Sequence, residues 1–463
     1  MKIAAKGSRV LWLVVCAAVR ATPQHDHAAH LRHLQAMDAM RPGSEGGWFS
    51  SGTSQVPAAT PTNMLHASAG GWNFMFEGVL FGVYTNQTGP RGRDKFFAPN
   101  WFMPMASHKL GGGVLTIRSM FTLEPLTITG KRYPLIFQEG ELANGIPIIN
   151  GQHPHDFFME LGIAYKRPIG KKIALNFFAG PRGDPTLGPP AFPHRASASE
   201  NPIAVIGHHF QDSTHISSNV ISAGVTAGPV TLEASGFHGR EPDEKRWGME
   251  QGPIDSFAAR LTVTPTARWA AQFSMGRINN REQSHPDRDT LRTSASIGYS
   301  RPFSGGHWVS TLIWGRNYDL EYTQQPNPQL LNTQGRSFRP LHIVSVPSRV
   351  PGYIYNSYLA ESRLLLRRKH WIWGRVENTD RDSYLLYEEA PFVILTEEQR
   401  YTRVQVYTAG YERELPRPVS WLSAGIGGQI MIFGVPQNLR PIYGDRPVGM
   451  QFFLRLRLRS PEQ

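Results

Sequence analysis

The sequence predicts an all-β protein: a transmembrane antiparallel β-barrel of about 16 strands, preceded by a disordered N-terminal extension. Short segments that alternate apolar and polar residues recur from about 71 to 460, and they are joined in turn by tight turns and by long polar loops. Aromatic residues gather at the strand ends beside the tight turns. Because hydrocarbon tolerates no unpaired sheet edge, strands of this kind are expected to close into a barrel.

The first segment, 1–21, has the features of a secretory signal peptide. Basic residues precede the apolar run 10–19, and Ala21 ends a small-residue cleavage site. The sole cysteine, Cys16, lies inside that run. The mature protein is therefore expected to contain no disulfide and to carry out no thiol chemistry, which suits an oxidising envelope.

Residues 22–70 are rich in His, Ala, Ser, Gly, Thr and Pro and lack a strand rhythm, which predicts a flexible periplasmic extension. No composition shift divides 71–463, so this region is expected to form one outer-membrane barrel. The net charge is +12 and the pI is near 9.8. Because export argues against nucleic acid, the expected partners are outer-membrane lipid and small solutes or metal ions.

The strands are recognised by a period of two with one apolar face. In the segment 255–264, Phe257 and Leu261 face one side while Arg260 and Thr262 face the other. The expected strands are 71–84, 112–123, 126–137, 155–166, 171–180, 212–226, 229–239, 255–264, 267–278, 291–301, 307–319, 354–367, 371–379, 401–414, 419–432 and 448–459.

Tryptophans open strands after tight turns, and tyrosines close strands before them, as in an interfacial girdle. These residues are Trp72, Trp269, Trp308, Trp371, Trp421, Tyr165, Tyr299 and Tyr411. A large soluble β-sandwich or propeller would also place tryptophan at strand ends, but no repeat of blade length is present. The girdle therefore favours a Gram-negative outer-membrane location.

Histidines cluster in two regions that could bind metal. The extension carries His25, His27, His30 and His33, and imidazole suits copper or zinc. The alternative is a solvated tail without a role. Two long loops carry the second group, which consists of His153, His155, His208 and His209. These loops are expected to be neighbours around the barrel, so their imidazoles could converge on a metal, or they could satisfy backbone groups of a packed plug.

A catalytic alternative rests on His215 and Ser217, which would point the same way if both lay on a strand. Glu241 would then orient the imidazole, so that serine, histidine and glutamate act as nucleophile, base and orienting group. The His-x-Ser step resembles that of outer-membrane phospholipase A and of lipid A deacylases. The Asn-Gly that follows the serine in the phospholipase is absent here, because Ser218-Asn219 follows instead.

Several motifs resemble an uncharacterised family of bacterial outer-membrane proteins, similar to proteins of copper-resistance settings. They are Ser51-Gly-Thr-Ser54 with Thr60-Pro61, Pro90-Arg-Gly92, Asn100-Trp-Phe102, Gln152-His-Pro-His-Asp156, His194-Arg-Ala-Ser197 with Glu200-Asn-Pro202, His208-His209, Asp212-Ser-Thr-His-Ile-Ser217 and Gly239-Arg-Glu-Pro242. The resemblance implies an outer-membrane location and no established activity. Copper-setting members have Met- and His-rich amino ends, and this extension is likewise rich in His but poor in Met.

The sequence as a whole predicts a porin-like barrel for the passage or handling of small solutes or metal ions such as copper. A lipid esterase built on His215 and Ser217 is the second hypothesis, and a binding or structural barrel with a plugged lumen is the third.

Overall fold

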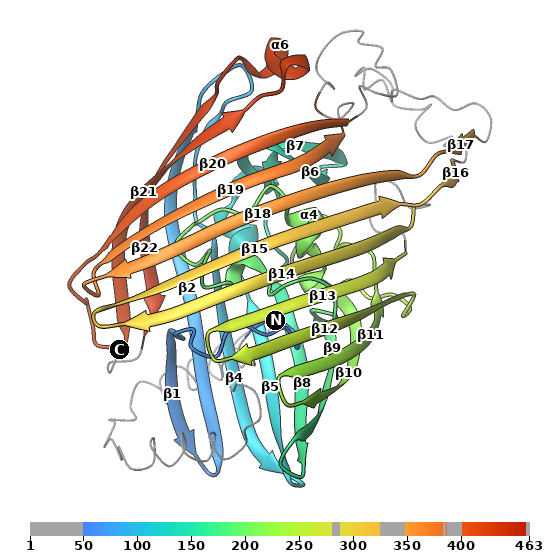
Figure 1. The fold of residues 1–463 in the computed structure, drawn as a ribbon. Helices are drawn as coiled ribbons and strands as arrows, with labels where there is room; N and C mark the ends of the chain where they lie inside the picture. Colours follow the sequence, from blue (N-terminus) through green and yellow to red (C-terminus); the bar gives the residue numbers. More distant parts are fainter. Residues whose placement is uncertain (1–49, 280–287, 325–347, 383–385, 387–400, 460–463) are drawn as a thin grey trace, which may run out of the picture.

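The computed structural model describes residues 50–279, 288–324, 348–382, 386 and 401–459. Within these ranges the chain forms a closed antiparallel barrel of 16 strands, which confirms the predicted fold class and strand number (Figure 1). The barrel closes between its first and last strands, where Val79 pairs with Arg457 and Gln87 with Gly449. The expected signal peptide and the histidines His25, His27, His30 and His33 lie outside the described residues.

The barrel strands are β2 (Trp72–Gln87), β4 (Asn100–Leu110), β5 (Gly113–Phe121), β8 (Phe158–Ile169), β9 (Ile173–Gly183), β10 (Ser217–Ala227), β11 (Val230–His238), β12 (Ser256–Thr266), β13 (Trp269–Ile278), β14 (Thr290–Phe303), β15 (Gly306–Asp319), β18 (Tyr353–Leu366), β19 (His370–Asp382), β20 (Tyr401–Glu414), β21 (Leu422–Gly434) and β22 (Val448–Leu458).

Two short strands and two hairpins complete the β-structure of the described residues. β1 (Met64–Ala69) and β3 (Asp94–Phe97) pair along β2, and the remaining strands form two separate hairpins. These hairpins are β6 (Tyr133–Ala143) with β7 (Ile146–Gln152), and β16 (Tyr322–Gln324) with β17 (Ser348–Val350). The helical turns are α3 (Glu124–Thr127), η2 (Thr129–Lys131), η3 (Phe192–His194), α4 (His208–Gln211), η4 (Ser213–Ile216), η7 (Gln437–Leu439) and α6 (Arg440–Tyr443). None of the helices in the described ranges is long and apolar enough to cross a membrane.

One expected strand was wrong, and one barrel strand was not foreseen. The segment 126–137 does not join the barrel; it forms α3, η2 and the start of the separate β6–β7 hairpin. The barrel strand that the sequence pattern does not predict is β4, which lies between the expected strands 71–84 and 112–123. Its inward residues Met103 and Met105 are apolar, as is the outward Phe102, so no apolar/polar alternation marks it.

The outer face of the barrel is apolar and carries the expected aromatic girdle. The ring of Tyr299 lies 4.5 Å from that of Trp269 and 5.3 Å from that of Trp308, measured between centroids. Trp371 departs from the expectation: it is 4% exposed, and its indole nitrogen donates to the Glu414 carboxylate at 3.1 Å. A closed barrel with an apolar outer face is the form in which β-sheet spans the Gram-negative outer membrane.

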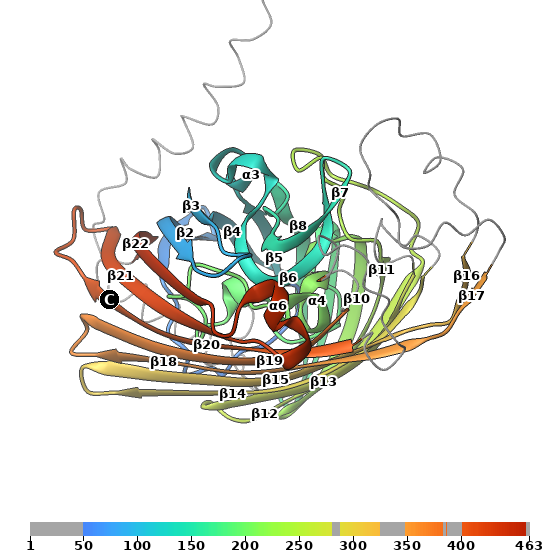
Figure 2. The ribbon, with the colours of Figure 1, turned by 90° about the horizontal axis from the view of Figure 1, so that it is seen from above.

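Much of the inward face of the barrel is polar, with many paired charges, and part of it carries an apolar cluster that includes Trp373 and Phe433. Arg118 Nε donates to Glu160 Oε1 at 2.7 Å, and Arg455 Nε donates to Glu412 Oε1 at 2.8 Å. All four of these residues are buried. Viewed from above, α4 lies within the ring of strands and the β6–β7 hairpin lies beside it (Figure 2). Lumenal arginines of this kind serve first as partners of buried carboxylates.

Part of the expected flexible extension lies inside the barrel. Ser50, Ser51 and Ser54 are at most 3% exposed, and the carbonyls of Ser50 and Gly52 accept hydrogen bonds from the Arg118 guanidinium. The segment then leads into β1, which pairs with the N-terminal part of β2, from Trp72 to Glu77. The polar composition of this segment suggests exposure to solvent. In the structure its carbonyl groups are instead hydrogen-bonded to buried Arg118 of β5.

Candidate metal centre

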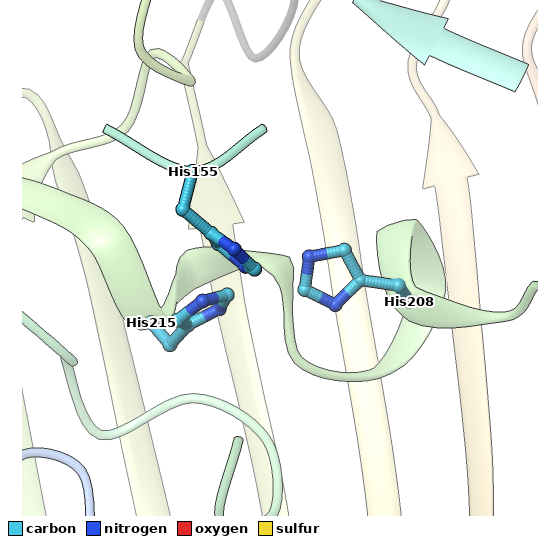
Figure 3. A group of neighbouring side chains, drawn as sticks. All are labelled: His155, His208 and His215. Carbon is cyan, nitrogen blue, oxygen red and sulfur yellow. The ribbon is translucent and has the colours of Figure 1, made fainter. Parts of the chain in front are cut away.

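Three histidines from separate loop segments converge inside the lumen. His155 comes from the loop between β7 and β8, His208 opens α4, and His215 lies in η4. One nitrogen of each ring can be chosen so that all three lie within 4.8 Å of one another. The rings point toward one another, and each residue is at most 7% exposed (Figure 3). Three imidazoles at this spacing are a donor set for a transition-metal ion.

Each of the three imidazole rings is oriented by a hydrogen bond from its Nδ1 atom. His155 Nδ1 donates to Glu124 Oε2 at 2.9 Å, and His208 Nδ1 donates to Asp212 Oδ1 at 2.7 Å. His215 Nδ1 donates to the backbone carbonyl of Asp212 at 2.8 Å. Because carboxylate and carbonyl oxygens only accept, these contacts place a proton on each Nδ1 and leave Nε2 to bind a ligand.

Two of the three Nε2 atoms, those of His155 and His215, are buried and have no hydrogen-bond partner among the described residues. A cavity of about 100 Å³ borders His155, Glu124 and Phe192. Buried polar atoms normally find a partner, so these two imidazole nitrogens are available as ligand atoms.

Asp212 is itself anchored to the barrel wall. Its carboxylate accepts from the Arg195 guanidinium and, at 3.0 Å, from the backbone N–H of Phe192. Arg195 Nε donates in turn to Glu361 Oε1 of β18 at 2.8 Å. The guanidinium outweighs burial and holds the pKa of the Asp212 carboxyl below its usual range. The carboxylate therefore stays ionised and fixes the tautomer of His208.

The electrostatic surroundings make the three imidazoles unequal. Burial lowers the pKa of His208, although Asp212 opposes the shift. Burial and the two neighbouring imidazoles hold the pKa of His215 well below its usual value. The pKa of His155 moves the other way, because the Glu124 carboxylate outweighs the effect of burial. At neutral pH, His208 and His215 are neutral and ready to coordinate.

The two other loop histidines predicted as metal ligands flank this centre. The ring centroids of His153 and His209 lie 5.9 Å apart, and each ring is beside a carboxylate. His153 Nε2 is 3.0 Å from Glu141 Oε1, and His209 Nδ1 is 3.4 Å from Glu241 Oε2. The His209 ring is 5.3 Å from that of His208. These histidines form an outer layer, whereas His215, first considered as a catalytic base, belongs to the inner three.

The structure does not bring His215 and Ser217 together in the way that the esterase hypothesis requires. The strand expected at 212–226 begins only at Ser217, and His215 lies in the 3-10 turn before it. Ser217 Oγ donates to the carbonyl of Thr214 at 2.8 Å. The third member of the expected group, Glu241, accepts from Ser213 Oγ at 3.0 Å. The premise of a shared strand face was therefore wrong.

Glu124 is a residue of the centre that the sequence did not reveal. It lies between the expected strands 112–123 and 126–137, where it opens α3, and its carboxylate accepts hydrogen bonds from the backbone N–H and from Nδ1 of His155. Contact between residues so distant in the chain leaves no local pattern. Spacing within the loop could have singled out Asp212, which lies four residues after His208.

Comparison with known proteins concerns the barrel alone. No protein-family model and no curated protein matches the sequence. An anion-selective porin from Comamonas acidovorans is 10% identical, with a TM-score of 0.46 over 84% of this chain and 100% of that chain. Salmonella typhi OmpF in complex with daunomycin is 6% identical, with a TM-score of 0.48 over 84% and 100%.

The outer-membrane channel DcaP of Acinetobacter baumannii is 10% identical, with a TM-score of 0.45 over 84% of this chain and 98% of that chain. Likenesses of this degree carry no argument about solute, ligand or activity. The candidate metal centre therefore rests on the geometry of this chain, and the architecture is a closed antiparallel barrel of 16 strands.

Proposed function

We propose that this barrel binds a transition-metal ion in its lumen and so handles metal ions at the outer membrane. One observation carries the proposal: the nitrogens of His155, His208 and His215 converge within 4.8 Å, and each ring is held through Nδ1. Rings that merely filled a plug would not need an acceptor on every Nδ1, here supplied by Glu124 and by the side chain and backbone of Asp212.

Neutral imidazoles suit copper or zinc, and a site of three histidines leaves a fourth position for water or for an exchanging ligand. Copper is the preferred ion, in keeping with the likeness to outer-membrane proteins of copper-resistance settings. The motifs of this chain that carry the resemblance contain His155, His208 and His215.

The filled lumen favours binding over the passage of large solutes. Ser50–Ser54 contact the wall at Arg118, and the loop that carries α4 is tied to β18 through Arg195. The cavity of about 100 Å³ borders His155, while His208 and His215 are not among the residues that line it. A space of this size accommodates an ion with a few waters. Ion transfer by way of this cavity would therefore pass His155.

The test uses the full-length barrel purified in detergent, with His25, His27, His30 and His33 replaced by Ala so that the extension does not contribute. After chelation and reloading with copper or zinc, we expect about one ion per chain to survive gel filtration. The variants His155→Ala, His208→Ala and His215→Ala should each lose it. The control is His370→Ala, an exposed residue bonded to Tyr411 away from the centre. Equal metal content in all variants would refute the proposal.

A further inference from the structure

A second group of soft side chains lines the lumen beside the histidine centre. Six of the 13 methionines in the sequence form one buried cluster, and none of the six is more than 4% exposed. They come from five strands that lie side by side in the barrel, namely β1, β2, β4, β5 and β8. The cluster consists of Met64, Met75, Met103, Met105, Met120 and Met159.

The strand register explains why these thioethers meet. Met75 on β2 lies directly opposite Met105 on β4, and Glu77 pairs with both Met64 and Met103. Other inward positions of the wall carry charged or hydroxyl side chains such as Arg260 and Ser274, or belong to a larger apolar cluster that contains a single methionine, Met431. The gathering of six thioethers in one part of the wall is therefore a local feature that an apolar lining alone does not demand.

An imidazole completes the cluster. His194, at the end of η3, places Nε2 at 3.3 Å from the sulfur of Met120. Its ring also lies 5.3 Å from that of Trp101, which packs against the methionines. This histidine lies in a loop segment, yet it is directed at the sulfur atoms on the wall. Thioether and neutral imidazole are ligands without charge, and soft sulfur selects monovalent copper over harder ions.

We propose that the methionine cluster and His194 form a second metal site, selective for soft monovalent ions of the Cu(I) type. The cavity that borders His155 is also lined by Met64, Trp101 and His194, so it connects the two sites. Ile216, next to His215 in the chain, packs within the methionine cluster. The two sites differ in ligand chemistry, and the existence of the thioether site does not depend on the function proposed for the histidine centre.

The experiment titrates Ag(I), a redox-inert probe of the same chemistry, into the full-length barrel in detergent. The ligands of the extension are removed by replacing His25, His27, His30 and His33 with Ala and Met37 and Met40 with Leu. The test variant combines Met103→Leu, Met105→Leu and Met120→Leu, which conserve volume and so preserve the fold. The matched control combines Met275→Leu and Met450→Leu, whose side chains are exposed on the outer face.

We expect the test variant to weaken Ag(I) binding by more than roughly tenfold, since these changes remove direct ligands. The control should bind as tightly as the parent protein. Anaerobic competition for Cu(I) with bicinchoninate should give the same order of affinities among the parent protein, the control and the test variant. The triple variant His155→Ala, His208→Ala, His215→Ala should keep the Ag(I) site, which separates this inference from the proposal above. Equal Ag(I) affinity in the test variant and in the control would overturn the inference and leave the cluster as packing.

Discussion

His208 and Asp212 lie one helical turn apart, and the imidazole Nδ1 donates to the Asp212 carboxylate at 2.7 Å. The backbone carbonyl of the same aspartate accepts from His215 Nδ1, so one residue orients two of the three rings. Because Asp212 fixes the tautomer and the orientation of the imidazoles, its replacement should change metal affinity more than it changes the conformation of the loop.

Replacement of Asp212 by Asn should therefore weaken metal binding at the three-histidine centre by roughly 10–100-fold. The amide keeps the shape of the side chain but loses the charge that supports the basicity of His208. Competition with a chromophoric chelator measures the affinity. The matched control is Asp255→Asn, which alters a carboxylate 3.0 Å from His238, outside the centre. Equal losses in both variants would mean that the effect is not specific to the centre.

Metal uptake at this centre should release about one proton per ion near pH 6.5. Glu124 outweighs burial and raises the pKa of His155 above 6.5, so this ring must lose a proton to coordinate. Burial lowers the pKa of His208 and of His215, and those rings are already neutral. Affinity should rise about tenfold per pH unit up to the pKa of His155 and then level off. Calorimetry in buffers of different ionisation enthalpy counts the protons, and a release near three would contradict the assignment.

The extension should bind copper, and zinc more weakly, independently of the barrel. A synthetic peptide of residues 22–45 carries His25, His27, His30 and His33, and solvated imidazoles keep an ordinary pKa. Its affinity should therefore collapse as pH falls through about 6.5, with several protons displaced. Replacing the four histidines by Ala should remove most of the binding. A calorimetric titration without heat at micromolar copper would exclude this role.

The Arg118–Glu160 pair should contribute strongly to barrel stability. Arg118→Leu would leave Glu160 buried without its guanidinium, at a cost of about 3–5 kcal/mol, and would free the carbonyls of Ser50 and Gly52. Urea unfolding of the barrel in detergent, followed by heat-modifiable migration on gels, measures the loss. The double variant Arg118→Leu, Glu160→Leu should recover much of it, because no buried charge then remains. A double variant less stable than the single one would show that the pair is not the cause.

The esterase hypothesis leads to a prediction of its own. Ser217→Ala should leave the hydrolysis of lipid or acyl-ester substrates unchanged, since the Ser217 hydroxyl donates to the carbonyl of Thr214 and His215 Nδ1 to the carbonyl of Asp212. Release of fatty acid from mixed micelles provides the assay. A robust activity that both Ser217→Ala and His215→Ala abolish would restore the enzyme hypothesis to first place.

The sequence by itself determined the fold class and most of the strands, because a period of two with one apolar face is a local property. The pattern failed where both faces of a strand are apolar, as in β4, and where a hairpin inside the lumen imitates a barrel strand, as in 126–137. The pattern also predicted that His215 lies on a strand, because a polar run before β10 has the same residue pattern whether it is extended or forms a 3-10 turn.

Only the tertiary structure decided which side chains meet. The sequence predicted His155 and His208 as candidate metal ligands in neighbouring loops. It could not show that His215 lies beside them or that Glu124 accepts a hydrogen bond from His155. The methionine cluster spans strands from β1 to β8, and its members meet only through strand register. Residue type and spacing report local geometry, whereas a coordination site depends on closure of the barrel and on the path of its loops through the lumen.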